Sequence, residues 1–259
     1  MHFETSNPPA SAGAFGVAPP GLACQYAALL APTKTSNRGI CRMLRFSEEI
    51  MLLLLSDNGG KFVDVPAPSL DCALAGAVLM DLALENRIDT DPQRLFVVDP
   101  SPLGDDLLDP TLARIVASGE SHDTAHWIRA TTDQADAIHD RSLDRLVDRG
   151  ILRREDDRFM WVFKSRRYPV IDDQTIREVK LRLMGVLFSD EIPDARDILL
   201  ISLSDVCGIF SSLLSSSELD AAAERIGQVR KLDLLGREVT SAVREIEASL
   251  AMAVAMPMH

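Results

Sequence analysis

The chain has 259 residues, 46% of them hydrophobic, so it is long enough to bury one full core or two small ones. Its 39 acidic and 27 basic residues give a formal net charge of −12. A field of that sign repels nucleic acid and anionic lipid alike, so binding to either requires a local basic patch.

The composition also predicts the compartment. The longest apolar runs, residues 72–80, 198–214 and 248–256, are all shorter than the ~20 residues that span a bilayer. His2 and Glu4 precede any lysine, so the N-terminus lacks the positively charged n-region of a signal peptide. The four cysteines include no CxxC pair, which argues against a disulfide framework. We therefore predict a cytoplasmic protein.

Residues 1–42 differ from the rest of the chain. They contain five of the 14 prolines among scattered glycine, serine and alanine, a composition that favours disorder. Met43 opens the first patterned segment. We interpret residues 1–42 as a disordered leader or an upstream extension of the reading frame, and residues 43–259 as the folded domain.

The first part of this domain is predicted to be helical with one hairpin. Ser47 is expected to cap a helix over residues 48–55, which carries two acids in its first turn. Residues 61–65 are predicted as a short strand. Residues 69–85 form a helix that is apolar nearly all round, which marks it as the buried central helix. Residues 88–90 and 95–98 then form a hairpin.

The remainder is predicted to be helical apart from a second hairpin, whose strands are residues 151–154 and 158–163. The predicted helices cover residues 105–118, 122–130, 134–149, 173–188, 195–214, 218–231 and 236–255. The fold class is therefore mainly α, a single helical domain around a buried central helix with small β-hairpins.

No catalytic or metal-binding motif is found. His122 and His126 have the i, i+4 spacing of zinc ligands, but Asp123 stands where a zinc protease needs glutamate, and a third ligand is missing. We interpret them as surface histidines. A GxSxG elbow is absent, and Gly59-Gly60-Lys61 lacks the spacing of a phosphate loop. The prediction is a protein that is not an enzyme and has no cofactor or metal.

The second hairpin is the strongest candidate for a contact surface. Residues 149–167 hold seven basic and three acidic side chains, a local sum of +4. Phe159, Trp161 and Phe163 share one face of the second strand. Three roles are open for that face: it closes a small satellite core, it packs into a partner subunit, or it enters a lipid interface. In the last case each flanking lysine or arginine would contribute about 1 kcal/mol to binding at an anionic surface. The predicted membrane or self-association surface comprises Arg153, Arg154, Arg158, Phe159, Trp161, Phe163 and Lys164.

A helix followed by a hairpin is also the outline of a winged-helix DNA binder. The helix over residues 133–149 carries five aspartates against three arginines, a sum of −2. Such a helix opposes contact with phosphates. A winged-helix nucleic-acid-binding regulator is therefore the alternative function, and the leading expectation is no nucleic-acid partner.

Four segments in order resemble the Golgi phosphoprotein 3 family, over about residues 43–255. They are FSEEIMLLLL (46–55), LAGAVLMDLALENRI (74–88), SPLGDDLL (101–108) and the helix–hairpin unit of residues 143–170 with its LVDRGIL and RYPV. The 22 arginines against five lysines favour a bacterial-type member. The resemblance implies a mostly helical domain without catalytic activity. Eukaryotic members are peripheral membrane adaptors that bind phosphatidylinositol 4-phosphate and Golgi glycosyltransferase tails.

The resemblance places the family's lipid pocket, a tryptophan and three arginines, at Pro66, Ala75, Asp136 and His139. All four family residues are replaced, and Asp136 puts a negative charge where a phosphate would lie. The predicted remaining contacts for an anionic headgroup are Arg87, Arg141 and Arg145. The expected partners are an anionic lipid or membrane surface and, through the hairpin, further copies of the chain.

Overall fold

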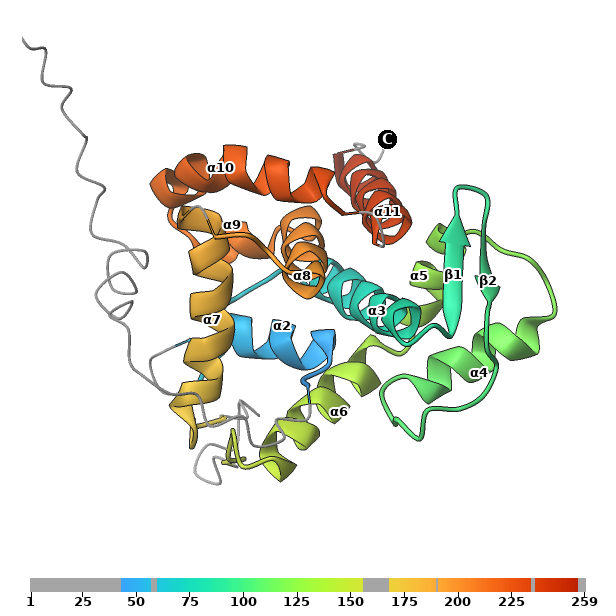
Figure 1. Cartoon of the computed structure of the whole chain (residues 1–259), viewed down its shortest axis with the longest axis horizontal. Helices are drawn as coiled ribbons and strands as arrows, with labels where there is room; N and C mark the ends of the chain where they lie inside the picture. Colours follow the sequence, from blue (N-terminus) through green and yellow to red (C-terminus); the bar gives the residue numbers. More distant parts are fainter. Residues whose placement is uncertain (1–42, 57–59, 156–167, 190, 234–235, 256–259) are drawn as a thin grey trace, which may run out of the picture.

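Helix α3 (Ala67–Leu84) runs through the middle of the molecule, and other helices are arranged around it (Figure 1). The structure is a computed structural model that describes residues 43–56, 60–155, 168–189, 191–233 and 236–255. Within these residues it confirms a mainly helical fold with one small antiparallel sheet. The other helices are α2 (Phe46–Leu54), α4 (Asp109–Ser118), α5 (Thr124–Thr132), α6 (Ala135–Asp148), α7 (Asp173–Phe188), α8 (Ala195–Val206), α9 (Ile209–Leu213), α10 (Ser216–Lys231) and α11 (Arg237–Ala255).

The prediction of a buried central helix is confirmed. Every residue of α3 from 72 to 82 is buried, and α2, α5, α6, α8 and α11 all contact the helix. Small residues allow these neighbours to come close. A Cβ atom added at Gly76 would lie 2.8 Å from Leu203 Cδ1 of α8. Among the described residues, α3 is the one helix that is long and apolar enough to cross a membrane. The core helix of a folded domain meets the same two criteria.

Helix α2 begins two residues earlier than predicted, and Ser47 does not cap it. The N-cap residue is Arg45, whose backbone N–H donates to Glu48 Oε2 at 2.6 Å. Ser47 is buried instead, and its hydroxyl accepts a hydrogen bond from Ser142 of α6 at 3.0 Å. The start of α2 is enclosed by other elements, so its polar side chains bond across elements as well as to their own backbone.

Other predicted bounds also differ from the structure. The helix predicted from residue 105 starts at Asp109, because the Asp109 carboxylate accepts the N–H groups of Leu103 and Asp105 and holds them in a turn. The helix predicted over residues 195–214 is divided into α8 and α9 by Gly208, which has a left-handed φ of 67°. Of the strand predicted over residues 61–65, only one isolated bridge between Leu55 and Phe62 is present.

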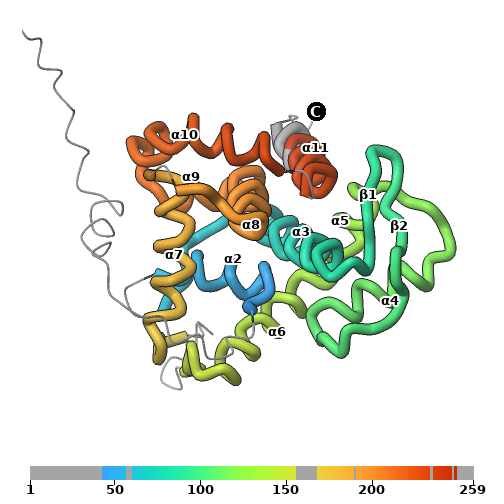
Figure 2. The backbone as a smooth tube through the Cα atoms, in the orientation of Figure 1, coloured from blue at the N-terminus to red at the C-terminus, as the bar shows by residue number. Residues whose placement is uncertain are grey.

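Strands β1 (Ile88–Asp91) and β2 (Arg94–Val97) form the first predicted hairpin. The trace in Figure 2 places this hairpin beside α4 and α5, on the side of the molecule away from α7. The N–H of Leu95 donates to the carbonyl of His122 at 2.8 Å, so the segment before α5 covers the outer edge of β2. The register pairs Ile88 with Val97, Asp89 with Phe96, Thr90 with Leu95 and Asp91 with Arg94.

Candidate functional site

The base of the second hairpin consists of residues 151–155 and 168–171, and we refer to it as the hairpin base. Leu152 and Val170 form an antiparallel bridge, and the N–H of Arg153 donates to the carbonyl of Pro169 at 2.9 Å. A loop anchors this pair, because the N–H of Tyr168 donates to the carbonyl of Gly60 at 3.0 Å. The two arms of the predicted hairpin are therefore joined at the body of the protein.

The hairpin base carries both basic and apolar groups at its surface. The side chains of Arg153 and Arg154 are 63% and 42% exposed, and they pair with Glu155 and Asp144. Ile171 is 61% exposed. Of the predicted contact residues, Arg153 and Arg154 thus lie together at this rim. The remaining five, Arg158, Phe159, Trp161, Phe163 and Lys164, lie outside the described residues.

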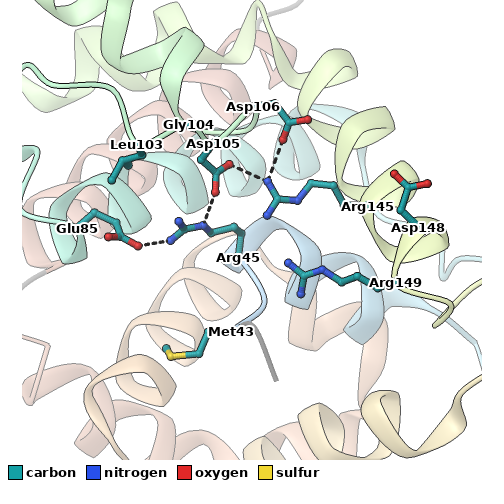
Figure 3. Close-up of a pocket in the computed structure, with 10 residues that line it drawn as sticks. All are labelled: Met43, Arg45, Glu85, Leu103, Gly104, Asp105, Asp106, Arg145, Asp148 and Arg149. Atoms are coloured by element: carbon teal, nitrogen blue, oxygen red, sulfur yellow. Dashed lines mark hydrogen bonds and ion pairs between the residues drawn. The ribbon is translucent and has the colours of Figure 1, made fainter. Parts of the chain in front are cut away.

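Next to the hairpin, a set of arginines and carboxylates surrounds the start of α2. Asp105 lies between Arg45 and Arg145 and accepts a hydrogen bond from each, at 2.9 and 2.7 Å (Figure 3). Arg45 also pairs with Glu85 at 2.5 Å. We call the whole set the α2 charge network, and its members are Arg45, Arg145, Arg149, Arg182, Arg196, Glu48, Glu49, Asp81, Glu85, Asp105, Asp106 and Asp197.

The carboxylates on the first turn of α2 connect several elements. Glu48, whose side chain is wholly buried, lies 3.4 Å from Arg145 Nε and 3.3 Å from Arg149 Nη2. Glu49 accepts from Arg182 of α7 at 2.7 Å and from Arg196 of α8 at 3.0 Å. The two glutamates therefore fasten α2 to α6, α7 and α8.

Asp81, near the end of α3, completes the network. Its carboxylate accepts the N–H of Phe46 at 2.8 Å and lies 3.5 Å from Arg196 Nη1. Arg196 in turn stacks on the ring of Phe46, with 4.0 Å between guanidinium carbon and ring centroid. Burial raises the pKa of Asp81 to about 7, although Arg196, the Phe46 N–H and Arg45 all favour its charged form.

A cavity of about 680 Å³ opens onto this network, and Figure 3 shows the side chains around it. Its lining has three arginines against four acids, so an anion entering it would meet a surface without excess positive charge. Arg45, Arg145 and Arg149 already pair with carboxylates at the distances given above. The lining residues are Met43, Arg45, Glu85, Leu103, Gly104, Asp105, Asp106, Arg145, Asp148 and Arg149.

The three arginines predicted to contact an anionic headgroup all lie in ion pairs. Arg145 belongs to the α2 charge network. Arg141 is half exposed and lies 3.2 Å from Asp106, and Arg87 pairs with Asp99. Arg141 and Arg145 come together beside Asp106, whereas Arg87 lies at the start of β1. An anion would have to compete with these carboxylates.

The positions that the resemblance assigns to a lipid pocket lie on α6 and α3, with Pro66 as the N-cap of α3. Asp136 and His139 lie on α6, and burial together with the nearby Asp136 raises the pKa of Asp71 on α3. The ring of His139 stands edge-on to Phe62 with centroids 6.4 Å apart. Ala75 is fully buried. This corner of the protein therefore holds acidic and aromatic groups.

His122 and His126 do not share a helix as predicted. Asp123 is the N-cap of α5, so His122 precedes the helix while His126 lies within it. Their rings stack with centroids 3.8 Å apart, and both stand edge-on to the buried Trp127. Among the described residues there is no group of three or more side chains suited to a metal ion.

The sequence matches a known family over most of the residues that build this site. The sequence model of the family Golgi phosphoprotein 3 (GPP34) matches residues 46–246. Vacuolar protein sorting-associated protein 74 of Eremothecium gossypii is 30% identical over 165 residues, which are 56% of this chain and 49% of that protein. The protein of that name from Schizosaccharomyces pombe is 27% identical over 167 residues, again 56% and 49%. The chain thus spans about half the length of these curated relatives.

Proposed function

The chain belongs to the Golgi phosphoprotein 3 (GPP34) family, and from this premise we propose that it is a non-enzymatic adaptor acting at a membrane surface. The hairpin base is the observation that supports this most. It combines exposed arginines with an exposed isoleucine on two bridged segments, a composition that suits the interface of an anionic bilayer. The aromatic residues Phe159, Trp161 and Phe163 lie between these two segments in the sequence.

We infer that lipid recognition rests on general electrostatic attraction to the hairpin and not on a shaped phosphoinositide pocket. The positions of the family's pocket carry Asp136 and His139, beside Asp71. Arg141 and Arg145, the nearest arginines of α6, are paired with carboxylates. A headgroup at either would have to displace an existing ion pair, which lowers its affinity.

Vesicle flotation tests the membrane role. The full chain is expected to float with vesicles of phosphatidylcholine and phosphatidylserine, and much less with phosphatidylcholine alone, because its attraction is to negative charge. Phe159→Ala combined with Trp161→Ala should reduce flotation. Ile192→Ala is the matched control, since Ile192 is 93% exposed on the loop before α8. Absence of flotation, or flotation unaltered by the double change, would contradict the proposal.

Self-association through the same hairpin is the companion proposal. The aromatic face that would enter lipid can equally pack on a second copy. Size-exclusion chromatography of a chain in which residues 156–167 are replaced by a short Gly-Ser turn should show a smaller assembly than the full chain. An identical elution profile would eliminate the hairpin as the oligomer contact.

The loss of the family pocket can be tested by restoring it in part. Asp136→Arg with His139→Arg should strengthen binding to vesicles that contain phosphatidylinositol 4-phosphate, because two charges of the right sign return beside α3. Wild type should not distinguish these vesicles from others of equal charge. A clear preference of the wild type for phosphatidylinositol 4-phosphate would show that another pocket exists.

The alternative, a winged-helix nucleic-acid-binding regulator, is tested by gel shift at low salt. Even non-specific binding appears under those conditions. Within the described residues, the arginines of α6 lie against Asp105, Asp106 and Glu48, which weakens this alternative. A shift at low salt would restore it.

A further inference from the structure

The outer edge of β1 differs from that of β2. In an antiparallel pair, alternate residues direct their backbone groups toward the partner strand and away from it. The N–H of Val98 donates to the carbonyl of Arg87, so residues 87, 89 and 91 of this arm face β2. Ile88 and Thr90 therefore direct their N–H and C=O groups away from the sheet.

These outward groups have no backbone partner within the described residues. The N–H of Thr90 is taken by the side chain of Asp89, at 2.8 Å in an exposed position. For the Ile88 N–H and for the Ile88 and Thr90 carbonyls, the structure contains no such bond in the part that it describes. β2, by contrast, is bonded to His122 along its outer side. One edge of the hairpin is covered and the other is open.

The open edge borders a cavity of about 350 Å³. One wall is β1 with the end of α3, and the other is the first turn of α11. Its lining combines the apolar residues Ala83, Ile88 and Val98 with the polar residues Asn86, Asp89, Thr90, Arg237 and Glu238. A space of this kind beside an unpaired strand has room for a further backbone and small apolar side chains.

We propose that the free edge of β1 binds an extended, basic segment of a partner protein, which adds to the hairpin as a third strand. The Ile88 N–H and the carbonyls of Ile88 and Thr90 supply hydrogen bonds that do not depend on sequence. Alternate side chains of the segment supply selectivity, because residues opposite Ile88 lie on the buried face of the strand and residues opposite Asp89 lie on its exposed face.

Charge identifies the segment as basic. Asp89 lies on the exposed face of β1 and lines the cavity together with Glu238, and Arg237 is the one basic residue of that lining; Asp91 is already paired with Arg94, at 3.2 Å. Lysine or arginine opposite Asp89 forms a favourable cross-strand pair. The net charge of −12 attracts a basic segment from a distance as well. A second copy of β1 would place aspartate against aspartate, which is unfavourable, so the edge is not suited to self-pairing.

Fluorescence anisotropy on the full chain tests this with a labelled peptide that alternates lysine and valine. The wild type should bind it and not bind the same peptide with glutamate in place of lysine. Thr90→Pro should weaken binding at least about tenfold, because the proline ring projects from the edge into the space that the added strand would occupy. The bonds between β1 and β2 use residues 89 and 91, so the hairpin is retained. Thr90→Ala is the matched control and should bind as the wild type does.

A second variant keeps the test decisive if Thr90→Pro alters the hairpin. Asp89→Lys should weaken the lysine peptide about threefold or more through charge alone. Asp220→Lys makes the same change in net charge on the exposed face of α10 and should have little effect. Equal loss in both would show that the peptide responds only to overall charge, and would overturn the proposal.

Hydrogen exchange locates the peptide independently. The Ile88 amide should exchange more slowly when the lysine peptide is bound, because its N–H then has an acceptor. Binding without protection of Ile88 would place the peptide elsewhere and overturn the assignment. The test is separate from the membrane role, since Arg153→Ala with Arg154→Ala should not change peptide binding.

Discussion

Around α2, Arg145 and Arg196 lie against buried carboxylates, whereas Arg153 and Arg154 at the hairpin base project into solvent and pair with exposed acids. The residue types are the same, and the surroundings are opposite. In the first region each charge is held by several partners from different helices, so removing one leaves others buried without compensation. In the second, water and salt replace a lost partner at little cost. Only the second is free to exchange one partner for another, as a contact surface must.

The largest effect expected from this comparison is on folding stability at Arg145. Arg145→Met leaves Glu48 buried with one guanidinium fewer, and should lower the free energy of unfolding by about 3 kcal/mol. Urea denaturation measures it. Arg141→Met is the matched control on the same helix: Arg141 is half exposed, so the loss should be below about 0.5 kcal/mol. If both variants lose less than about 0.5 kcal/mol of unfolding free energy, Arg145 is not held by Glu48 and is available to bind an anion.

The next effect is a dependence on pH at Asp81. Its pKa is about 7 in the folded protein against an ordinary 3.8, so the folded state holds this proton more tightly than the unfolded chain does. Stability contributed by the group is therefore lost as pH rises between those values. The stability of wild type relative to Asp81→Asn should fall by on the order of 2 kcal/mol from about pH 5 to about pH 8. The side-chain amide introduced by this change keeps an acceptor for the Phe46 N–H.

Asp105 serves as a control because its pKa is shifted in the opposite direction to that of Asp81. Burial disfavours its charge, but the Leu107 N–H together with Arg145 and Arg45 lowers its pKa. Its contribution is present above the ordinary pKa of an aspartate and is lost as pH falls. The difference between wild type and Asp105→Asn should therefore move in the other direction with pH. The same slope for both variants would show that the two carboxyls are not in distinct environments.

At the hairpin base the expected effect is on membrane binding. Arg153→Ala with Arg154→Ala should weaken binding to anionic vesicles about thirtyfold, since each arginine near a charged surface contributes about 1 kcal/mol. Added salt should remove the difference. Arg94→Ala is the control, because Arg94 is equally exposed and paired but lies on β2. If Arg94→Ala weakens vesicle binding as much as the double variant does, the hairpin base has no special role in membrane binding.

The smallest effect is on stability of the same double variant. Exposed ion pairs contribute little, so unfolding of Arg153→Ala with Arg154→Ala should match the wild type within about 0.5 kcal/mol. Thermal denaturation of both proteins, followed by circular dichroism, measures this difference in stability. A large loss would move the hairpin base into the same class as the α2 charge network and remove the contrast between them.

Local patterns in the sequence predicted the local structure well. Helix α7 has the predicted bounds Asp173–Phe188, because an aspartate precedes it as a cap and its apolar residues recur with helical spacing. The break between α8 and α9 was missed, since Gly208 lies within the mostly apolar run of residues 198–214, in which Asp205 is the one charged residue. Single glycines are tolerated in helices, and only the packing around them decides whether the chain turns there.

The α2 charge network could not be predicted, because its pairs are distant in sequence. Glu49 meets Arg182 and Arg196, which are 133 and 147 residues away along the chain. The only sign of this network in the sequence was the pair Glu48 and Glu49. Acids in the first turn of a helix are expected from the helix dipole alone, so the pair did not point to partners elsewhere in the chain. For the candidate site, the sequence predicted the start of the hairpin but not its closure at Val170.

The chain contains two tryptophans, and their positions provide a built-in optical assay. Trp127 is buried on α5 against the stacked imidazoles of His122 and His126, so its emission reports on the helical body. Trp161 belongs by sequence to the hairpin. Trp127→Phe would leave one fluorophore there, and a blue shift of its emission on adding vesicles would show the indole leaving water without any attached dye. The reverse variant, Trp161→Phe, would follow unfolding of the body alone.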